Sequence, residues 1–263
     1  TFISGPMMRA AYTTIAGTAN RTGLVSTLIL PIAVYTFREA VRNRLFVLTL
    51  GGMVCLLGLA AFVGELAVTE QRQIQASIIG AGIRLFAVCT VCLFVITSTV
   101  REFNDKGFEL ILSLPAPRSS YFLGKCAGFM LLALVISAAG AVLLLLYSDP
   151  GAVLLWYVSL ACELLILVAL SLLCLFTFGN ITVACMLVLG FYLLARSMET
   201  IRLVSMSPIL ESHTLSQEFM NGLVGAIALF LPDLHRFARS EWLIHGGDWA
   251  VLPPILIQTV IYV

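Results

Sequence analysis

Long uninterrupted runs of apolar residues constrain this chain more than any other feature of its sequence. Residues 126–147 form one such run, in which nearly every side chain is apolar. A helix of about 20 residues crosses the roughly 30 Å hydrocarbon core of a bilayer. Hydrophobic residues make up 60% of the chain and charged residues 11%, against about 45–50% and 25% in soluble domains. The sequence therefore predicts an all-α integral membrane protein.

Six apolar runs are predicted to be transmembrane helices of one bundle. They are residues 45–64, 79–100, 126–147, 153–176, 181–195 and 250–263. The last run stops at the final residue and would cover only about 21 Å, so we expect the sixth helix to be truncated in this chain. We divide the chain into an N-terminal segment, 1–44, and a transmembrane domain, 45–263.

The segment 34–44 is predicted to be an amphipathic helix in the membrane interface, which we call the elbow helix. Apolar residues recur on one side and charged residues on the other. The apolar side holds Val34, Phe37, Val41 and Leu45, and the polar side holds Arg38, Glu39, Arg42 and Asn43. The alternative is a seventh span that begins at Leu24 and is broken at Pro31.

The segment 196–249 is too polar to cross a membrane and too apolar to be a solvated linker. Its run 221–231 is apolar, but it is too short to span and is followed by Pro232. We expect a re-entrant segment on the outer side, between the fifth and sixth spans.

The distribution of Lys and Arg predicts that the N-terminus is cytoplasmic. With that orientation nine basic residues lie inside and five outside. The inner nine are Arg9, Arg21, Arg38, Arg42, Arg44, Arg101, Lys106, Arg118 and Lys125. The outer five are Arg72, Arg196, Arg202, Arg236 and Arg239.

Two ionisable residues fall within the predicted spans, Arg84 in the second and Glu163 in the fourth. A charge at this depth is costly and marks a candidate functional site. Glu163 could take up protons, contact a substrate or pair with Arg84, while Arg84 could instead extend to the outer boundary. Both residues are candidates for a substrate path.

Neither a metal site nor an enzyme is predicted from the remaining residues. His213, His235 and His245 match no tight ligand spacing, and no serine-histidine-acid order or HExxH motif occurs. The net charge of +1 gives no basic face for nucleic acid.

The main cytoplasmic loop, residues 101–125, reads REFNDKGFELILSLPAPRSSYFLGK. Its charged start leads into a leucine-rich run, which Pro115 and Pro117 end because proline cannot continue a helix. A short helix held by a stiff corner suits either a simple connector or the docking of another protein.

This loop resembles the signature of the type-2 (export) superfamily of ABC transporter permeases. The matching residues are Glu102, Lys106, Gly107, Glu109, Leu112, Pro115, Arg118, Gly124 and Lys125, while Phe108 and Pro117 depart from it. The segments 36–46 and 231–237 are also similar to the family's elbow helix and to the stretch before its last helix.

The resemblance implies a permease subunit of the cell (inner) membrane that pairs with a second permease copy or paralogue. ATP and Mg would be bound by a separate cytoplasmic ABC ATPase subunit, because this chain contains no GxxxxGK[ST] phosphate loop. The matching loop residues other than Gly124 would couple the ATPase to export. The alternatives are a haem- or metalloenzyme-maturation ABC permease and a non-ABC channel or secondary carrier.

Overall fold

The structure is a computed structural model, and it describes residues 21–66, 71–104, 118–205, 237 and 252–263. Within these ranges every element is an α-helix. The helices are α2 (Arg21–Arg42), α3 (Arg44–Leu66), α4 (Gln71–Asn104), α6 (Arg118–Leu144), α7 (Pro150–Phe178), α8 (Ile181–Ser205) and α12 (Leu252–Tyr262). The expected all-helical architecture is therefore confirmed for the described part of the chain.

Four of the described helices are long and apolar enough to cross a membrane. Their apolar segments are Arg44–Glu65, Gln75–Glu102, Tyr121–Leu144 and Pro150–Phe178. They coincide with the first four predicted spans. The fifth and sixth predicted spans fall on two shorter apolar helices, Ile181–Ser197 and Leu252–Tyr262. The chain thus has the helices of a multi-pass membrane protein, and the count of six spans stays a prediction.

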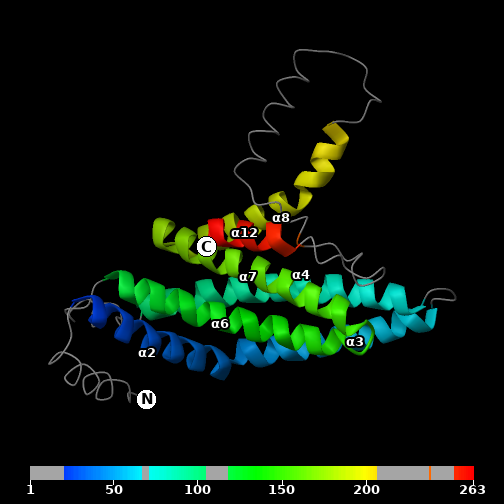
Figure 1. The fold of residues 1–263 in the computed structure, drawn as a ribbon, viewed down its shortest axis with the longest axis horizontal. Helices are drawn as coiled ribbons and strands as arrows, with labels where there is room; N and C mark the ends of the chain where they lie inside the picture. Colours follow the sequence, from blue (N-terminus) through cyan, green and yellow to red (C-terminus); the bar gives the residue numbers. More distant parts are fainter. Residues whose placement is uncertain (1–20, 67–70, 105–117, 206–236, 238–251) are drawn as a thin grey trace, which may run out of the picture.

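The helix α7 forms the centre of the bundle and contacts α4, α6, α8 and α12. Figure 1 shows α4, α6 and α7 side by side along the long axis, with α2 and α3 following one another on one side. Residues 159–164 of α7, six in a row that together cover every side of the helix, are all buried. Such all-round burial is what a helix that is apolar on every face requires.

Local capping signals set the ends of α7 and the start of α8. Pro150 is tolerated in the first turn of α7, where its missing N–H would have no helical partner. The helix ends at Gly179, which has a φ of 64° and donates its N–H to the carbonyl of Leu175 at 2.9 Å. The side chain of Asn180 then accepts the N–H of Thr182 at 3.0 Å.

The helix α2 differs from the elbow helix expected at 34–44. It runs from Arg21 through Pro31 to Arg42 and lies along α6. A Cβ added to Gly124 would lie 2.9 Å from Ile32, and one added to Gly128 would lie 2.6 Å from Thr36. The two helices are therefore parallel and in close backbone contact, as small residues at i and i+4 permit.

This contact decides which side of α2 is buried. Ala33, Thr36 and Ala40 are buried against α6, whereas Val34 of the predicted apolar side is 39% exposed. The backbones can approach closely at Ala33 and Thr36 because Gly124 and Gly128 have no side chains. The charged residues of the expected polar side, including Arg38 and Arg42, are exposed as predicted.

Several predictions fall outside the described residues. The helix α8 continues to Ser205, ten residues beyond the expected end of the fifth span at 195. Of the remaining expected re-entrant segment only Phe237 is described after this helix. The loop 101–125, which was predicted to be cytoplasmic, is described up to Asn104 and again from Arg118. The N-terminal segment is described from Arg21 onward.

Candidate functional site

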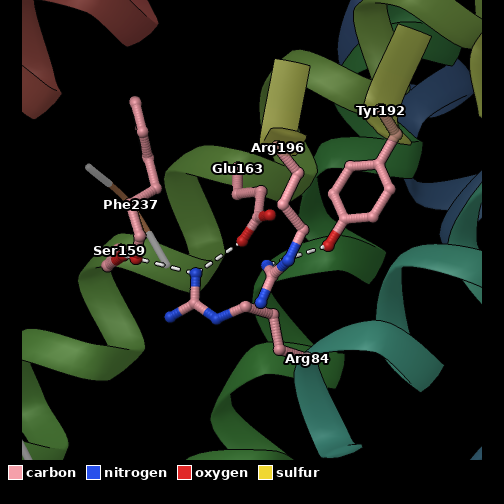
Figure 2. Close-up of polar contacts among 6 residues, drawn as sticks. All are labelled: Arg84, Ser159, Glu163, Tyr192, Arg196 and Phe237. Carbon is pink, nitrogen blue, oxygen red and sulfur yellow. Dashed lines mark hydrogen bonds and ion pairs between the residues drawn. The ribbon is translucent and has the colours of Figure 1, made fainter. Parts of the chain in front are cut away.

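The two ionisable residues of the predicted spans form an ion pair in the centre of the bundle. Arg84 of α4 donates from Nη1 to Oε2 of Glu163 of α7 at 2.5 Å (Figure 2). The side chain of Arg84 is 2% exposed and that of Glu163 is fully buried. Of the roles that the sequence left open, the structure shows the pairing with Arg84 and not an extension of Arg84 to the boundary.

One face of α7 supplies the surroundings of this pair. Trp156, Ser159 and Glu163 are spaced so that they lie on the same side of a helix. The Arg84 guanidinium lies 5.5 Å from the centre of the Trp156 ring, within the range of a cation–π interaction. Ser159 Oγ is 3.5 Å from Arg84 Nη1 and donates to the backbone carbonyl of Phe237.

A second arginine comes from α8. Arg196 donates from Nη1 to the hydroxyl of Tyr192 at 3.3 Å, and Figure 2 shows both side chains extending from α8 toward the ion pair. Tyr192 is buried and lies within electrostatic reach of Arg84, Glu163 and Arg196. The cluster thus combines two guanidinium groups with one carboxylate. We call these residues, together with Trp156 and Ser159, the central polar cluster.

The central polar cluster has unused hydrogen-bonding capacity. Arg84 Nη2, Glu163 Oε1 and Trp156 Nε1 are buried and have no hydrogen-bond partner among the described residues. In an apolar environment an unpaired polar group is costly, and water cannot reach it easily. Two donors and one acceptor of this kind can bind a polar or anionic group that enters the bundle.

Sequence reasoning singled out only the two charges of this cluster. Trp156, Ser159, Tyr192 and Phe237 were missed because each is unremarkable in its own segment. The spacing of Tyr192 and Arg196, four residues apart, is the one local signal that would have linked them on a helix. Arg196 had been placed at the start of the outer segment.

A second ion pair lies where the loop 101–125 meets the bundle. Lys125 of α6 pairs with Glu102 at the end of α4. The side chain of Lys125 is 3% exposed and that of Glu102 is 26% exposed. The Lys125 ammonium also lies 3.4 Å from the Tyr121 hydroxyl and 5.8 Å from the centre of the Phe129 ring. This pair joins the two helices that hold the loop.

Three of the eight predicted coupling residues belong to described helices. Glu102 and Lys125 are brought together, and Arg118 is the first residue of α6. The other five, Lys106, Gly107, Glu109, Leu112 and Pro115, lie outside the described residues. The coupling role of all eight stays a prediction.

No metal-binding group of three or more His, Cys, Asp or Glu residues occurs among the described residues. The three histidines of the chain lie outside them. A scan against protein-family models finds no match, and a search of the curated proteins finds no similar protein. The fold and the two ion pairs therefore define an all-helical protein suited to a membrane, and any more specific function is a proposal.

Proposed function

We propose that this chain is the membrane-spanning permease subunit of an ATP-driven ABC exporter. The observation that carries the proposal is the loop signature from Glu102 to Lys125, with its charged start, leucine-rich run and proline corner. The ion pair between the two end residues supports it, because a loop that transmits force needs firmly held ends.

The packing of α4 and α6 gives a physical route for such a force. Both helices contact α7, and α4 carries Arg84 of the central polar cluster. A displacement of the loop would therefore shift α4 and α6 against α7. We propose that this movement changes the access of a substrate to Arg84 and Glu163, which would line the substrate path.

The proposal requires partners that this chain does not supply. Two cytoplasmic ABC ATPase subunits would bind ATP and Mg, and a second permease copy or paralogue would complete the path. The chain itself would have no enzymatic activity. We propose the cell (inner) membrane as its location, with the N-terminus in the cytoplasm.

The test is purification from the native membrane in mild detergent, followed by mass spectrometry and an ATPase assay. We expect an ABC ATPase to co-purify with the chain. In the variant Glu109→Arg we expect either that the ATPase no longer co-purifies or that the permease no longer stimulates its ATP hydrolysis. Glu65→Arg is the matched control, because Glu65 is an exposed carboxylate at the other end of the first span. A preparation that transports without any ATPase would refute the proposal.

One observation favours a second candidate, a non-ABC channel or secondary carrier. Buried ion pairs with unpaired atoms, such as Arg84 and Glu163, are also found in proton-coupled and ion-coupled carriers. Reconstitution into vesicles separates the two classes. Transport driven by a proton or ion gradient alone would favour the carrier, and strict ATP dependence would favour the exporter.

A further inference from the structure

A basic pocket lies at the junction of α2 and α3, away from the Arg84–Glu163 pair and next to the Lys125–Glu102 pair, since Arg101 lines it. Its volume is about 520 Å³, and α4 closes one side of it. The pocket is lined by Tyr35, Arg38, Glu39, Arg42, Asn43, Arg44 and Arg101. These residues hold four arginines against one glutamate, a formal charge of +3 in a chain whose total is +1.

The backbone at the junction of α2 and α3 places three of these arginines, Arg38, Arg42 and Arg44, around the same pocket. Asn43 separates the two helices, and its side-chain oxygen accepts the N–H of Leu45 at 3.1 Å, which caps the start of α3. Arg42 and Arg44 therefore flank a fixed turn, and Arg38 lies one helical turn before Arg42.

The chemistry of the lining residues selects a phosphate group. Guanidinium groups bind phosphate oxygens in pairs of hydrogen bonds and stay charged at every physiological pH. Among the described residues that line the pocket Glu39 is the only carboxylate, so the net positive charge disfavours a cationic ligand. The volume is ample for a phosphodiester headgroup.

Exposed apolar side chains on both sides of the pocket indicate where the rest of the ligand would lie. Leu30 of α2 is 71% exposed, and Val47 and Leu48 of α3 are 67% and 61% exposed. The two α3 residues lie near the start of the first apolar span, three and four residues after Arg44. Tyr35, with an apolar ring and a polar hydroxyl, is the side-chain type found at the interface between lipid and water.

We propose that this pocket is a binding site for the phosphate headgroup of an anionic membrane lipid, whose acyl chains lie along the exposed face of α3. The site requires only that the chain is in a membrane. It does not depend on an ATPase partner or on export.

The test uses the purified full chain, stripped of lipid in a neutral detergent, and native mass spectrometry with phosphatidylglycerol or phosphatidylcholine. We expect phosphatidylglycerol to be retained in preference to phosphatidylcholine. Each arginine near a membrane surface contributes enough for about a fivefold change in affinity. Arg42→Gln should therefore weaken binding about fivefold, and the triple variant Arg38→Gln, Arg42→Gln, Arg44→Gln about a hundredfold.

Two further variants make the test specific. Arg72→Gln makes the same chemical change as Arg42→Gln at a distant position. Arg72 lies near the start of α4, whereas Arg101 of the pocket lies near its end, so Arg72→Gln should leave lipid binding unchanged. Glu39→Gln removes the one carboxylate of the pocket and should strengthen binding. Because it changes the affinity in the opposite direction, its effect cannot be explained by partial unfolding, and a thermal melt of each variant checks the fold.

The remaining outcomes overturn the proposal. Equal retention of both lipids, or full retention of phosphatidylglycerol by the triple variant, would show that the pocket does not bind the lipid headgroup specifically. Inorganic phosphate that binds as tightly as phosphatidylglycerol would identify a soluble phosphate ligand instead. If the triple variant kept phosphatidylglycerol but lost a co-purifying protein, the pocket would be a protein contact.

Discussion

Arg84 of α4 and Glu163 of α7 form an ion pair of 2.5 Å that is almost completely removed from solvent. The pair ties together two helices that are otherwise held by apolar packing. A buried pair of this kind is not strongly stabilising compared with two apolar residues, but loss of one partner leaves an uncompensated charge. This asymmetry gives the first prediction.

Removal of either charge alone should destabilise the protein, and removal of both should cost much less. We expect Arg84→Met or Glu163→Met to lower the unfolding free energy by about 3–5 kcal/mol. The double variant should recover most of that loss. Thermal unfolding in detergent compares the stability of all three variants. The control is Glu65→Gln, which removes an exposed carboxylate. Additive losses in the double variant would contradict a direct energetic coupling.

The same double variant separates a structural role from a substrate contact. If Arg84 and Glu163 line the substrate path, the folded double variant should lose most ATP-driven transport in vesicles. Two buried methionines present no charge or strong donor to a polar substrate. Transport at the original rate by this variant would assign the pair to structure alone.

The Lys125–Glu102 ion pair, where the loop 101–125 meets the bundle, should respond unequally to removal of its two partners. Glu102→Gln leaves the buried Lys125 ammonium without its carboxylate and should cost about 1–3 kcal/mol. Lys125→Met fills the same space between Tyr121 and Phe129 and leaves a carboxylate that is 26% exposed. We expect that loss to stay below about 1 kcal/mol. Chemical denaturation in detergent compares the two, and the reverse order would contradict this account.

The contact between α2 and α6 should tolerate no side chain at Gly128. A Cβ there would lie 2.6 Å from Thr36 Cβ and 2.8 Å from the Ala33 carbonyl oxygen. We expect Gly128→Ala to cost about 1–3 kcal/mol, because the helices must move apart. Gly58→Ala is the matched control, since nothing lies within 4 Å of its Cβ position. It should be neutral or slightly stabilising, and equal melting temperatures for the two variants would refute the close contact.

The predicted orientation places the two ends of α7 on opposite sides of the membrane. The helix has 29 residues, and Asp149 and Asn180 are exposed beyond its ends. In a variant without its seven cysteines, Asp149→Cys should react with an impermeant maleimide in intact cells. Asn180→Cys should react only after the membrane is opened. The opposite pattern would reverse the orientation, and labelling of both positions from outside would exclude α7 as a span.

The sequence alone predicted the architecture well and the central polar cluster in part. Four apolar runs became four long helices because about 20 apolar residues in lipid must form their hydrogen bonds within the segment. Arg84 and Glu163 were found because a charge inside such a run is conspicuous. Trp156, Ser159 and Phe237 were not, because residues of these types occur in any helix or loop.

The tertiary structure decided which faces of the helices meet. The spacing in 34–44 placed Val34 on the apolar side of this helix, but it did not show that Ala33 and Thr36 would be buried against α6. Gly124 and Gly128 allow that contact because they have no side chains. Likewise Lys125 pairs with Glu102, and Tyr192 lies near Glu163, through contacts between different helices. Local composition fixes whether a segment is apolar and helical. The pairing of helix faces depends on side chains from several segments at once, and no single segment contains that information.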